Sequence, residues 1–338
     1  MRDQRLNILF IFPDPESLWQ GAAQTAAGRL PGHEVHCAYM LDDAVAYVSD
    51  ADVIVSFSLR PDLALMARNL KWVHALGAGV DRITSIAELR PDVIITNTRG
   101  MHADPVSEAA LSMMFALSRD FRRAERDQRA KRWVPWNSLL LSGKTIGIVG
   151  VGVISEALAG KCRALGMRTL GLSGRTGAVA GFERIYAPAD QRKMLGLCDY
   201  VVLLAPLKST NVGMVDRCFL DAMKPTAFLI NVARGPLVDS AALTVALRDG
   251  RIGGAGLDAN DPEPLPATSP LWEMNNVIIT PHVAGRFDGY LDRALDIFGI
   301  NLRWFIRNDH ARMVNRVDRS TGMISNPWHD VHSDAHLS

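Results

Sequence analysis

The chain has 338 residues, of which 48% are hydrophobic and 22% are charged, a composition typical of folded domains and unlike that of disordered segments. This length suffices for two domains of roughly 150 residues each. Because 37 Lys and Arg residues nearly balance 36 Asp and Glu residues, the net charge is only +1. Such a chain has no overall attraction for nucleic acid or for an anionic membrane surface.

The lengths of the apolar runs and the spacing of the cysteines bear on whether the protein spans a membrane, binds a metal or is built on disulfides. The longest apolar runs, 6–12 and 200–207, fall far short of the roughly 20 residues that a membrane-spanning helix requires. The cysteines are too widely spaced for a metal site and too few for a disulfide scaffold; they are Cys37, Cys162, Cys198 and Cys218. We therefore expect a cytoplasmic protein with reduced thiols and no membrane or metal partner.

Short β-branched runs alternate with helical or turn-rich segments in the first hundred residues. These predicted strands cover residues 7–12, 52–55, 71–74 and 92–96. Alternation of this kind predicts a parallel sheet with helices on both faces.

A change of pattern follows at Ala103. Apolar residues recur there at three- and four-residue spacing, which predicts one long helical stretch to about Arg132. Residues 119–132 include seven basic and three acidic side chains, and in a neutral chain this favours a solvated helix face or inter-subunit ion pairs over a nucleic-acid surface.

Strands and helices alternate again from Lys144. The predicted strands cover 145–149, 168–172, 199–204, 227–231, 255–257 and 276–280, enough for a second doubly wound sheet. A last helix is predicted from about Arg286 to Ile306. The polar residues from about Val314 onward have little to bury, so we expect an arm or a frayed tail there.

The first motif that carries chemistry is a glycine-rich turn after the strand 145–149. Gly150 allows a tight turn, and Gly152 lets a pyrophosphate approach the N–H groups of the following helix, which begins with Val153 and Ile154. Ser155 stands where a third glycine would allow close packing. The motif predicts a dinucleotide site, although a purely structural turn has the same residues.

The next strand, 168–172, ends in Ser173, Gly174, Arg175 and Thr176. An acid at this place would hydrogen-bond the adenosine ribose of NAD(H) and would repel a 2′-phosphate. A hydroxyl and a guanidinium bind such a phosphate instead. We therefore predict NADP(H) as the preferred cofactor, with NAD(H) possible; the alternative is that Arg175 is only a surface turn residue.

Three polar residues follow later strand ends: Arg234, Glu263 and His282. Singly they are explained as a turn arginine, a loop acid and a histidine at a strand end. Together they supply a fixed cation, a proton donor and an acid able to pair with that donor, which is the equipment for carbonyl reduction.

The motifs around these residues resemble those of the D-isomer-specific 2-hydroxyacid dehydrogenases, a family that includes glyoxylate/hydroxypyruvate reductases. The similarity runs from residue 6 to about 310, and its most specific segments are 147–152, 223–225, 230–239, 256–258, 263–266 and 280–285. It implies an α/β fold with two doubly wound parallel-sheet domains. A Rossmann NAD(P)-binding domain, residues 100–287, would be inserted in a flavodoxin-like substrate-binding domain, residues 1–99 and 288–338.

The resemblance also implies roles for individual residues. Arg234 would hold the substrate carboxylate and polarise the keto oxygen, His282 would protonate that oxygen, and Glu263 would pair with His282 and keep its imidazolium populated. Backbone N–H groups of the loop Leu76, Gly77, Ala78 and Gly79 would bind the substrate carboxylate. Further cofactor contacts would come from Ala205, Pro206, Val232, Ala233, Asp258 and His282.

The function predicted is NADPH-preferring reduction of glyoxylate or hydroxypyruvate to a D-2-hydroxy acid, in a homodimer that pairs through the helix 103–132. Trp133 and Trp136 would either reach the partner's active site or pack the interface. The alternatives are an enzyme for a larger 2-keto acid and a dinucleotide-sensing protein that resembles the family's corepressors. For His329, His332 and His336, the polar surroundings favour a floppy tail over a metal site.

Overall fold

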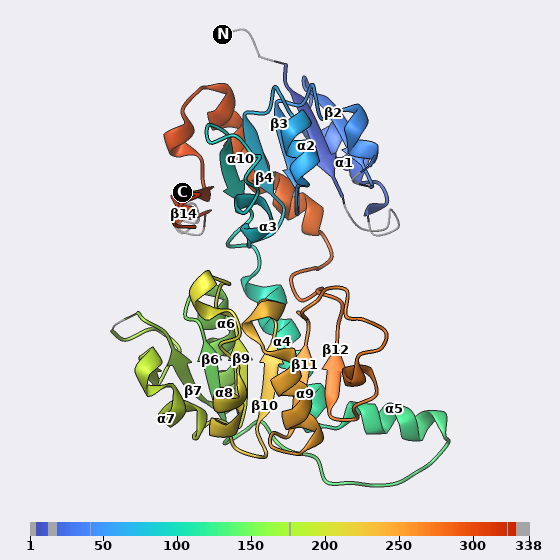
Figure 1. Cartoon of the computed structure of the whole chain (residues 1–338), viewed down its shortest axis with the longest axis vertical. Coiled ribbons are helices and arrows are strands. Elements are labelled where there is room, and N and C mark those ends of the chain that lie inside the picture. Colours follow the sequence, from blue (N-terminus) through green and yellow to red (C-terminus); the bar gives the residue numbers. More distant parts are fainter. Residues whose placement is uncertain (1–4, 13–18, 41, 176, 323, 329–338) are drawn as a thin grey trace. The chain divides into compact units, whose positions relative to one another are not determined.

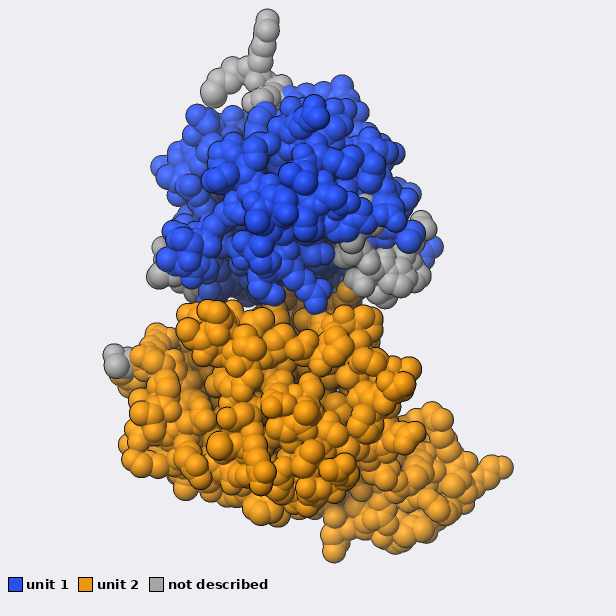
Figure 2. Space-filling model, in the orientation of Figure 1, with its two compact units in different colours: residues 1–101, 287–338 blue, residues 102–286 orange. Residues whose placement is uncertain are grey.

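The computed structural model describes residues 5–12, 19–40, 42–175, 177–322 and 324–328. The chain divides into two compact units, unit 1 with residues 1–101 and 287–338 and unit 2 with residues 102–286 (Figure 2). Each unit contains one seven-stranded sheet with helices on its faces (Figure 1). The α/β fold class predicted from the sequence is confirmed.

Unit 1 is built around a sheet with the strand order β14-β13-β5-β4-β3-β1-β2. Strands β1 to β5 pair in parallel, and β13 pairs antiparallel with β5 and β14. The order of β2, β1, β3, β4 and β5 is that of flavodoxin-like folds. The elements are β1 (Asn7–Ile11), α1 (Ala22–Arg29), β2 (Glu34–Ala38), β3 (Val53–Ser56), α2 (Pro61–Met66), β4 (Trp72–Ala75), α3 (Asp81–Thr84), β5 (Ile94–Asn97), α10 (Tyr290–Ile306), β13 (Arg316–Val317) and β14 (Ile324–Ser325).

Unit 2 has the strand order β12-β11-β10-β9-β6-β7-β8, with every neighbouring pair parallel. The chain runs from β6 outward to β8 and then returns to β9 on the other side of β6. Ligands of doubly wound sheets bind at this reversal. The elements are α4 (Ala103–Ser118), α5 (Phe121–Arg129), β6 (Thr145–Val149), α6 (Val153–Ala164), β7 (Arg168–Leu172), β8 (Arg184–Tyr186), α7 (Gln191–Leu195), β9 (Tyr200–Leu203), α8 (Arg217–Ala222), β10 (Phe228–Asn231), α9 (Ser240–Arg248), β11 (Gly254–Leu257) and β12 (Val277–Ile279).

The central strands of both sheets are buried and mostly apolar on both faces, as expected where helices cover both sides. In unit 2, Ile146 and Ile148 of β6 face a core with α4 and α6, while alternate residues of β9 and β10 face α7, α8 and α9. In unit 1, α1 and α10 cover one face and α2 and α3 the other. None of the helices in the described part of the chain combines the length and apolar character needed to cross a membrane.

The long helix predicted from Ala103 to Arg132 is wrong as a single element. The helix is interrupted between α4 and α5, because Asp120 adopts the left-handed region at φ 54°. Its carboxylate accepts a hydrogen bond from Arg123 N at 3.2 Å and so caps the start of α5. Apolar spacing does not show this break, because an N-cap depends on one side chain.

The prediction of an arm or frayed tail from about Val314 is wrong for residues 314–322 and 324–328. Val314 is 1% exposed and Asn315 is fully buried, and Asn315 Nδ2 donates to the carbonyl oxygens of Asn97 and Arg99 at 3.0 and 2.8 Å. The segment extends one edge of the sheet by two short strands, β13 next to β5 and β14 at the edge. Polar residues are held here by hydrogen bonds to backbone, a contribution that apolar periodicity does not reveal. His329, His332 and His336 lie outside the described residues.

A buried histidine lies in the sheet of unit 1. His74 in β4 is fully buried, and its Nδ1 lies 2.7 Å from Thr96 Oγ1, which also accepts a hydrogen bond from Trp72 Nε1 at 2.8 Å. Among the described residues, His74 Nε2 has no hydrogen-bond partner. Burial lowers the pKa of His74 from its ordinary 6.5 to about 3.

We expect acid to destabilise the protein through His74. In the unfolded chain the His74 imidazole has a pKa near 6.5, whereas in the folded chain its pKa is about 3. The stabilising contribution is therefore complete above pH 6.5 and is lost as the pH falls toward 3, by on the order of 4 kcal/mol. His74→Leu should flatten the pH dependence of the urea unfolding free energy in this range. His36→Gln is the control, since its side chain is 32% exposed; an unchanged slope in His74→Leu would contradict the prediction.

Candidate active site

The glycine-rich turn lies where β6 ends, at the reversal point of the sheet of unit 2. Gly150 has φ 96°, and a Cβ there would meet Ala205 N at 2.5 Å, so the turn and the end of β9 pack at a distance that only glycine allows. A Cβ on Gly152 would meet nothing within 4 Å. The space beside Gly152 is therefore open, at the start of a 12-residue helix whose first N–H groups lack intrahelical acceptors.

Ser155 stands at the position of the third glycine, and its side chain bonds back to the start of the glycine-rich turn. Its hydroxyl donates to Gly150 O at 2.5 Å, and the residue is 2% exposed. The turn thus keeps the two features that a pyrophosphate needs, which are backbone N–H groups at a helix N-terminus and free space above them. Val153 and Ile154 lie in the first turn of α6. These residues fit a dinucleotide.

The loop after β7 places Ser173 and Arg175 next to the first turn of α6. Val149 at the end of β6 pairs with Leu172 at the end of β7, so the segments that follow leave the sheet at the same edge. Arg175 N donates to Ser173 Oγ at 3.1 Å, and Arg175 Nη1 lies 3.2 Å from Glu156 Oε1 of α6. Thr176, the other residue predicted here, lies outside the described residues.

The arginine turn after β10 is held by a buried asparagine. Asn231 is fully buried, its Nδ2 donates to Arg234 O and Ala259 O at 3.0 and 3.1 Å, and its Oδ1 accepts from Ala233 N at 3.1 Å. One side chain therefore joins the turn that carries Arg234 to the loop after β11. Asn231 was not among the predicted site residues, although it stands directly before the Val-Ala-Arg-Gly run.

Gly235 brings the same two loops into contact. A Cβ at this position would lie 1.8 Å from Asn260 O and 2.7 Å from Asp261 N, an overlap with backbone that no side chain can relieve. Arg234 itself is half-buried, and its Nη1 donates to Ala233 O at 2.8 Å. Val232 and Ala233, predicted as cofactor contacts, are both 8% exposed.

The histidine turn after β12 is anchored on Asp258. The carboxylate of Asp258 is buried and accepts three hydrogen bonds, from Thr280 Oγ1 at 2.5 Å and from the backbone N–H groups of Val283 and Ala284 at 2.9 Å. His282 N donates to Asp258 O at 2.9 Å. These bonds hold His282 at φ 54°, a left-handed conformation that costs free energy for a residue with a side chain. A cofactor contact of Asp258 stays a prediction; the structure shows its part in fixing the turn.

Glu263 and His282 meet directly. His282 Nδ1 lies 3.0 Å from both carboxylate oxygens of Glu263, and Asn260 N donates to Glu263 Oε1 at 3.0 Å. The side chains of the histidine and the glutamate are 39% and 22% exposed. With Nδ1 facing the carboxylate, Nε2 is the ring nitrogen that can exchange a proton with a bound molecule.

In unit 1, the loop Leu76–Gly79 follows β4. Leu76 O accepts hydrogen bonds from Thr98 Oγ1 and Tyr290 Oη, and Ala78 O accepts one from Asn97 Nδ2 at 2.8 Å. Because a trans peptide directs its N–H opposite to its carbonyl, the N–H groups of Gly77 and Gly79 point away from these partners. The loop is therefore oriented to offer two backbone donors to an anion.

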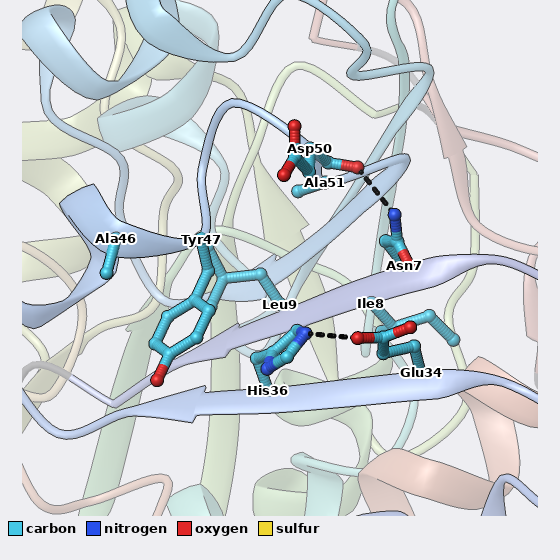
Figure 3. A pocket seen from close by; sticks show the side chains of 9 residues that line it. All are labelled: Asn7, Ile8, Leu9, Glu34, His36, Ala46, Tyr47, Asp50 and Ala51. Carbon is cyan, nitrogen blue, oxygen red and sulfur yellow. Dashed lines mark hydrogen bonds and ion pairs between the residues drawn. The ribbon is translucent and has the colours of Figure 1, made fainter.

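A separate cavity of about 290 Å³ lies in unit 1, where β1 and β2 begin (Figure 3). The rings of His36 and Tyr47 stack there at 4.4 Å, and Glu34 pairs with His36 and with Arg5. This is the amino-terminal end of the parallel strands, opposite to the end where such sheets bind ligands. Within the described residues, no cluster of His, Cys, Asp and Glu side chains could hold a metal ion.

Alanine substitutions at the two glycines of the turn after β6 should have different effects, one on stability and the other on dinucleotide binding. Gly150→Ala should lower the free energy of unfolding by on the order of 1–3 kcal/mol, because it adds left-handed strain and a backbone clash. Gly152→Ala, with extended backbone at φ −174° and open space around it, should leave the melting temperature unchanged but weaken dinucleotide binding on the order of tenfold. Thermal melts and calorimetric titration check both. Tight binding by Gly152→Ala would contradict the placement of the pyrophosphate.

Comparison with known proteins agrees with these features. A family model described as D-isomer specific 2-hydroxyacid dehydrogenase, NAD binding domain, matches residues 111–284. A glyoxylate reductase of Thermococcus onnurineus is 33% identical over 300 residues, which are 84% of this chain and 87% of the relative. A glyoxylate reductase of Korarchaeum cryptofilum is 32% identical over 78% of this chain and 82% of its own length.

Solved structures show the same fold. The NADPH-dependent glyoxylate/hydroxypyruvate reductase of Sinorhizobium meliloti, in complex with NADP and sulfate, has a TM-score of 0.82 and 27% identity, and the match covers 94% of this chain and 100% of the other. A D-isomer specific 2-hydroxyacid dehydrogenase of Xanthobacter autotrophicus, in complex with NADPH and MES, has a TM-score of 0.79 and 29% identity, with 95% and 100% covered. With a family model that matches half of its residues, this chain belongs to the D-isomer specific 2-hydroxyacid dehydrogenase family and is a nicotinamide-dinucleotide-dependent oxidoreductase acting on small hydroxy or keto acids.

Proposed function

We propose that the chain is an NADPH-preferring reductase of small 2-keto acids, glyoxylate or hydroxypyruvate, which it converts to D-2-hydroxy acids. The observation that carries the proposal is the Glu263–His282 pair, held at 3.0 Å on a turn that the buried Asp258 carboxylate fixes. Such a fixed pair suits proton transfer to a carbonyl oxygen. The relatives named glyoxylate reductase and glyoxylate/hydroxypyruvate reductase support the choice of substrate.

The residues of the chain divide the work of reduction. When bound, the nicotinamide supplies the hydride that reduces the keto carbon. Arg234 binds the substrate carboxylate and polarises the keto oxygen, so it stabilises the negative charge that grows there. His282 Nε2 gives a proton to the same oxygen, and in the reverse direction it removes one. Glu263 accepts a hydrogen bond from Nδ1 and so keeps the ring oriented with Nε2 toward the substrate.

The loop Leu76–Gly79 is proposed to bind the substrate carboxylate through the N–H groups of Gly77 and Gly79. Its two glycines leave room for a small anion next to the main chain. Residues 100–287 are proposed to bind the cofactor, with Ala205, Pro206, Val232, Ala233 and Asp258 among the contacts, and residues 1–99 and 288–338 to bind the substrate.

Preference for NADPH is proposed from the loop after β7. Ser173 and Arg175 offer a hydroxyl and a guanidinium where an acid would select NADH. The neighbouring structures determined with NADP or NADPH bound support this assignment. We also propose that the enzyme works in the cytoplasm. Because the cytoplasmic NADP pool is mostly reduced, the reaction would run there in the direction of reduction.

A homodimer is proposed from exposed apolar residues on the segment 121–140. Trp133 is 98% exposed, and Phe121 and Leu140 are 57% and 60% exposed. Trp136 instead packs on its own chain, where Arg123 lies 4.8 Å from its ring and its Nε1 donates to Arg119 O at 3.3 Å. We therefore propose that Trp133, of the two tryptophans, contacts a partner subunit.

His282→Gln should lower kcat for glyoxylate reduction by about 100- to 10,000-fold, because it removes the proton donor. Glu263→Gln should cause a smaller loss, since the ring stays but its orientation weakens. Arg234→Gln should raise KM and lower kcat together, because it removes both binding and charge stabilisation. Absorbance at 340 nm measures all three, and circular dichroism checks the fold. The control is His36→Gln, and near-native turnover by His282→Gln would refute the assignment.

Arg175→Ala should lower kcat/KM for NADPH by about tenfold, because a charge-assisted hydrogen bond to the 2′-phosphate is lost. The value for NADH should change less than about twofold, since that cofactor has no charge at this position. Steady-state kinetics with both cofactors at saturating glyoxylate measure the ratio. An unchanged ratio would show that Arg175 is a surface residue without a role in cofactor choice.

A further inference from the structure

The guanidinium proposed to bind the 2′-phosphate already has an anionic partner. Arg175 Nη1 lies 3.2 Å from Glu156 Oε1, with side-chain exposures of 54% and 37%. Glu156 is the fourth residue of α6, and its N–H donates to Gly152 O at 2.9 Å within the first turn of that helix. A carboxylate therefore stands next to the turn at which an anionic cofactor would bind.

The loop that carries Arg175 is supported against α6. Gly181 in this loop packs so closely that a Cβ would lie 3.2 Å from Ala159 Cβ and 3.5 Å from Gly160 N. Its carbonyl accepts a hydrogen bond from Thr169 Oγ1 at 2.5 Å. Ser173 Oγ accepts one from Arg175 N at the other end of the loop. Gly181 thus packs this loop on α6, and the ion pair itself places the Arg175 guanidinium at Glu156.

Charge determines what this pair does to a phosphate. Arg175 alone would present one positive charge to a 2′-phosphate, but the Arg175–Glu156 pair presents none. A phosphate with nearly two negative charges must then either take the guanidinium from Glu156 or bind beside a carboxylate. A ribose hydroxyl, as in NADH, carries no charge and is affected far less.

We infer that Glu156 is a specificity-determining residue: it occupies Arg175 and so weakens binding of the 2′-phosphate, which makes the enzyme less selective for NADPH than Ser173 and Arg175 alone would make it. This inference rests on the proposed role of Arg175 in NADPH binding. If Glu156 instead holds Arg175 in its binding position, removing the carboxylate will weaken binding of the 2′-phosphate. The sign of the change therefore separates the two roles.

The test is calorimetric titration of the full-length protein with 2′,5′-ADP and with 5′-AMP, which differ by the 2′-phosphate alone. Glu156→Gln should bind 2′,5′-ADP about three- to tenfold more tightly than the native chain, a gain that shrinks with added salt. Binding of 5′-AMP should change by less than about twofold. Because the Glu156 side chain is partly exposed and glutamine has nearly its shape, we expect the helix to stay intact, and a thermal melt checks this.

Glu183→Gln is the matched control. Glu183 pairs with Arg168 at 2.7 Å in the same unit, with side-chain exposures of 51% and 55%, so its replacement makes the same change in net charge away from the cofactor turn. It should alter neither affinity. The gain from Glu156→Gln should also shrink when Arg175→Ala is present, since competition for that guanidinium is then gone and only the direct repulsion between carboxylate and phosphate remains.

Three results would overturn the inference: unchanged or weaker 2′,5′-ADP binding by Glu156→Gln, an equal gain in Glu183→Gln, or a gain that is undiminished without Arg175. If Arg175→Ala alone weakens 2′,5′-ADP binding while Glu156→Gln has no effect, the inference about Glu156 fails and the proposed NADPH preference stands. If Arg175→Ala has no effect on 2′,5′-ADP, the proposed preference itself fails.

Discussion

The hydrogen bonds of the Asp258 carboxylate are the constraint on which the proposed chemistry depends. A histidine in the left-handed region is unfavourable by itself, and the turn 280–284 would relax without an anchor. Asp258 supplies that anchor, because its two oxygens accept from one hydroxyl and two backbone N–H groups while the residue is 2% exposed. A buried carboxylate without such donors would be costly, so the turn and the acid stabilise each other. The result is a histidine whose Nδ1 faces Glu263.

Close packing of backbone against backbone places the other residues of the site. Gly150 lets the turn after β6 touch the end of β9, and Gly235 lets the arginine turn touch the loop that leads to Glu263. Gly256 in β11 similarly admits Met113 of α4, since a Cβ there would lie 2.9 Å from its sulfur. These close contacts fix the turns after β6 and β10 and the position of β11 against α4. Such precision is what hydride and proton transfer to one carbonyl group require.

Much of the fold could be predicted from the sequence, and the physical reason differs from one element to the next. The strands at 145–149 and 168–172 were predicted to the residue, because buried parallel strands are apolar along their whole length and end sharply at glycine or polar residues. The edge strands β2 and β8 were missed, since a strand with a partner on one side needs less apolar character. The break at Asp120 and the docked segment after Val314 depend on single side chains bonding to backbone, which no periodicity reports.

For the site, sequence motifs named Arg234, Glu263 and His282, but not what holds them. The bonds of Asn231 and the anchoring part of Asp258 join loops that are far apart in the chain. The pairing of Arg175 with Glu156, 19 residues away, depends on how the loop after β7 folds onto α6.

The most direct measurement of the proposed activity is a panel of 2-keto acids assayed with NADPH and NADH in parallel. We expect the highest kcat/KM for glyoxylate or hydroxypyruvate with NADPH; clear preference for a bulky aromatic or branched keto acid, or no turnover of any, would contradict the proposal.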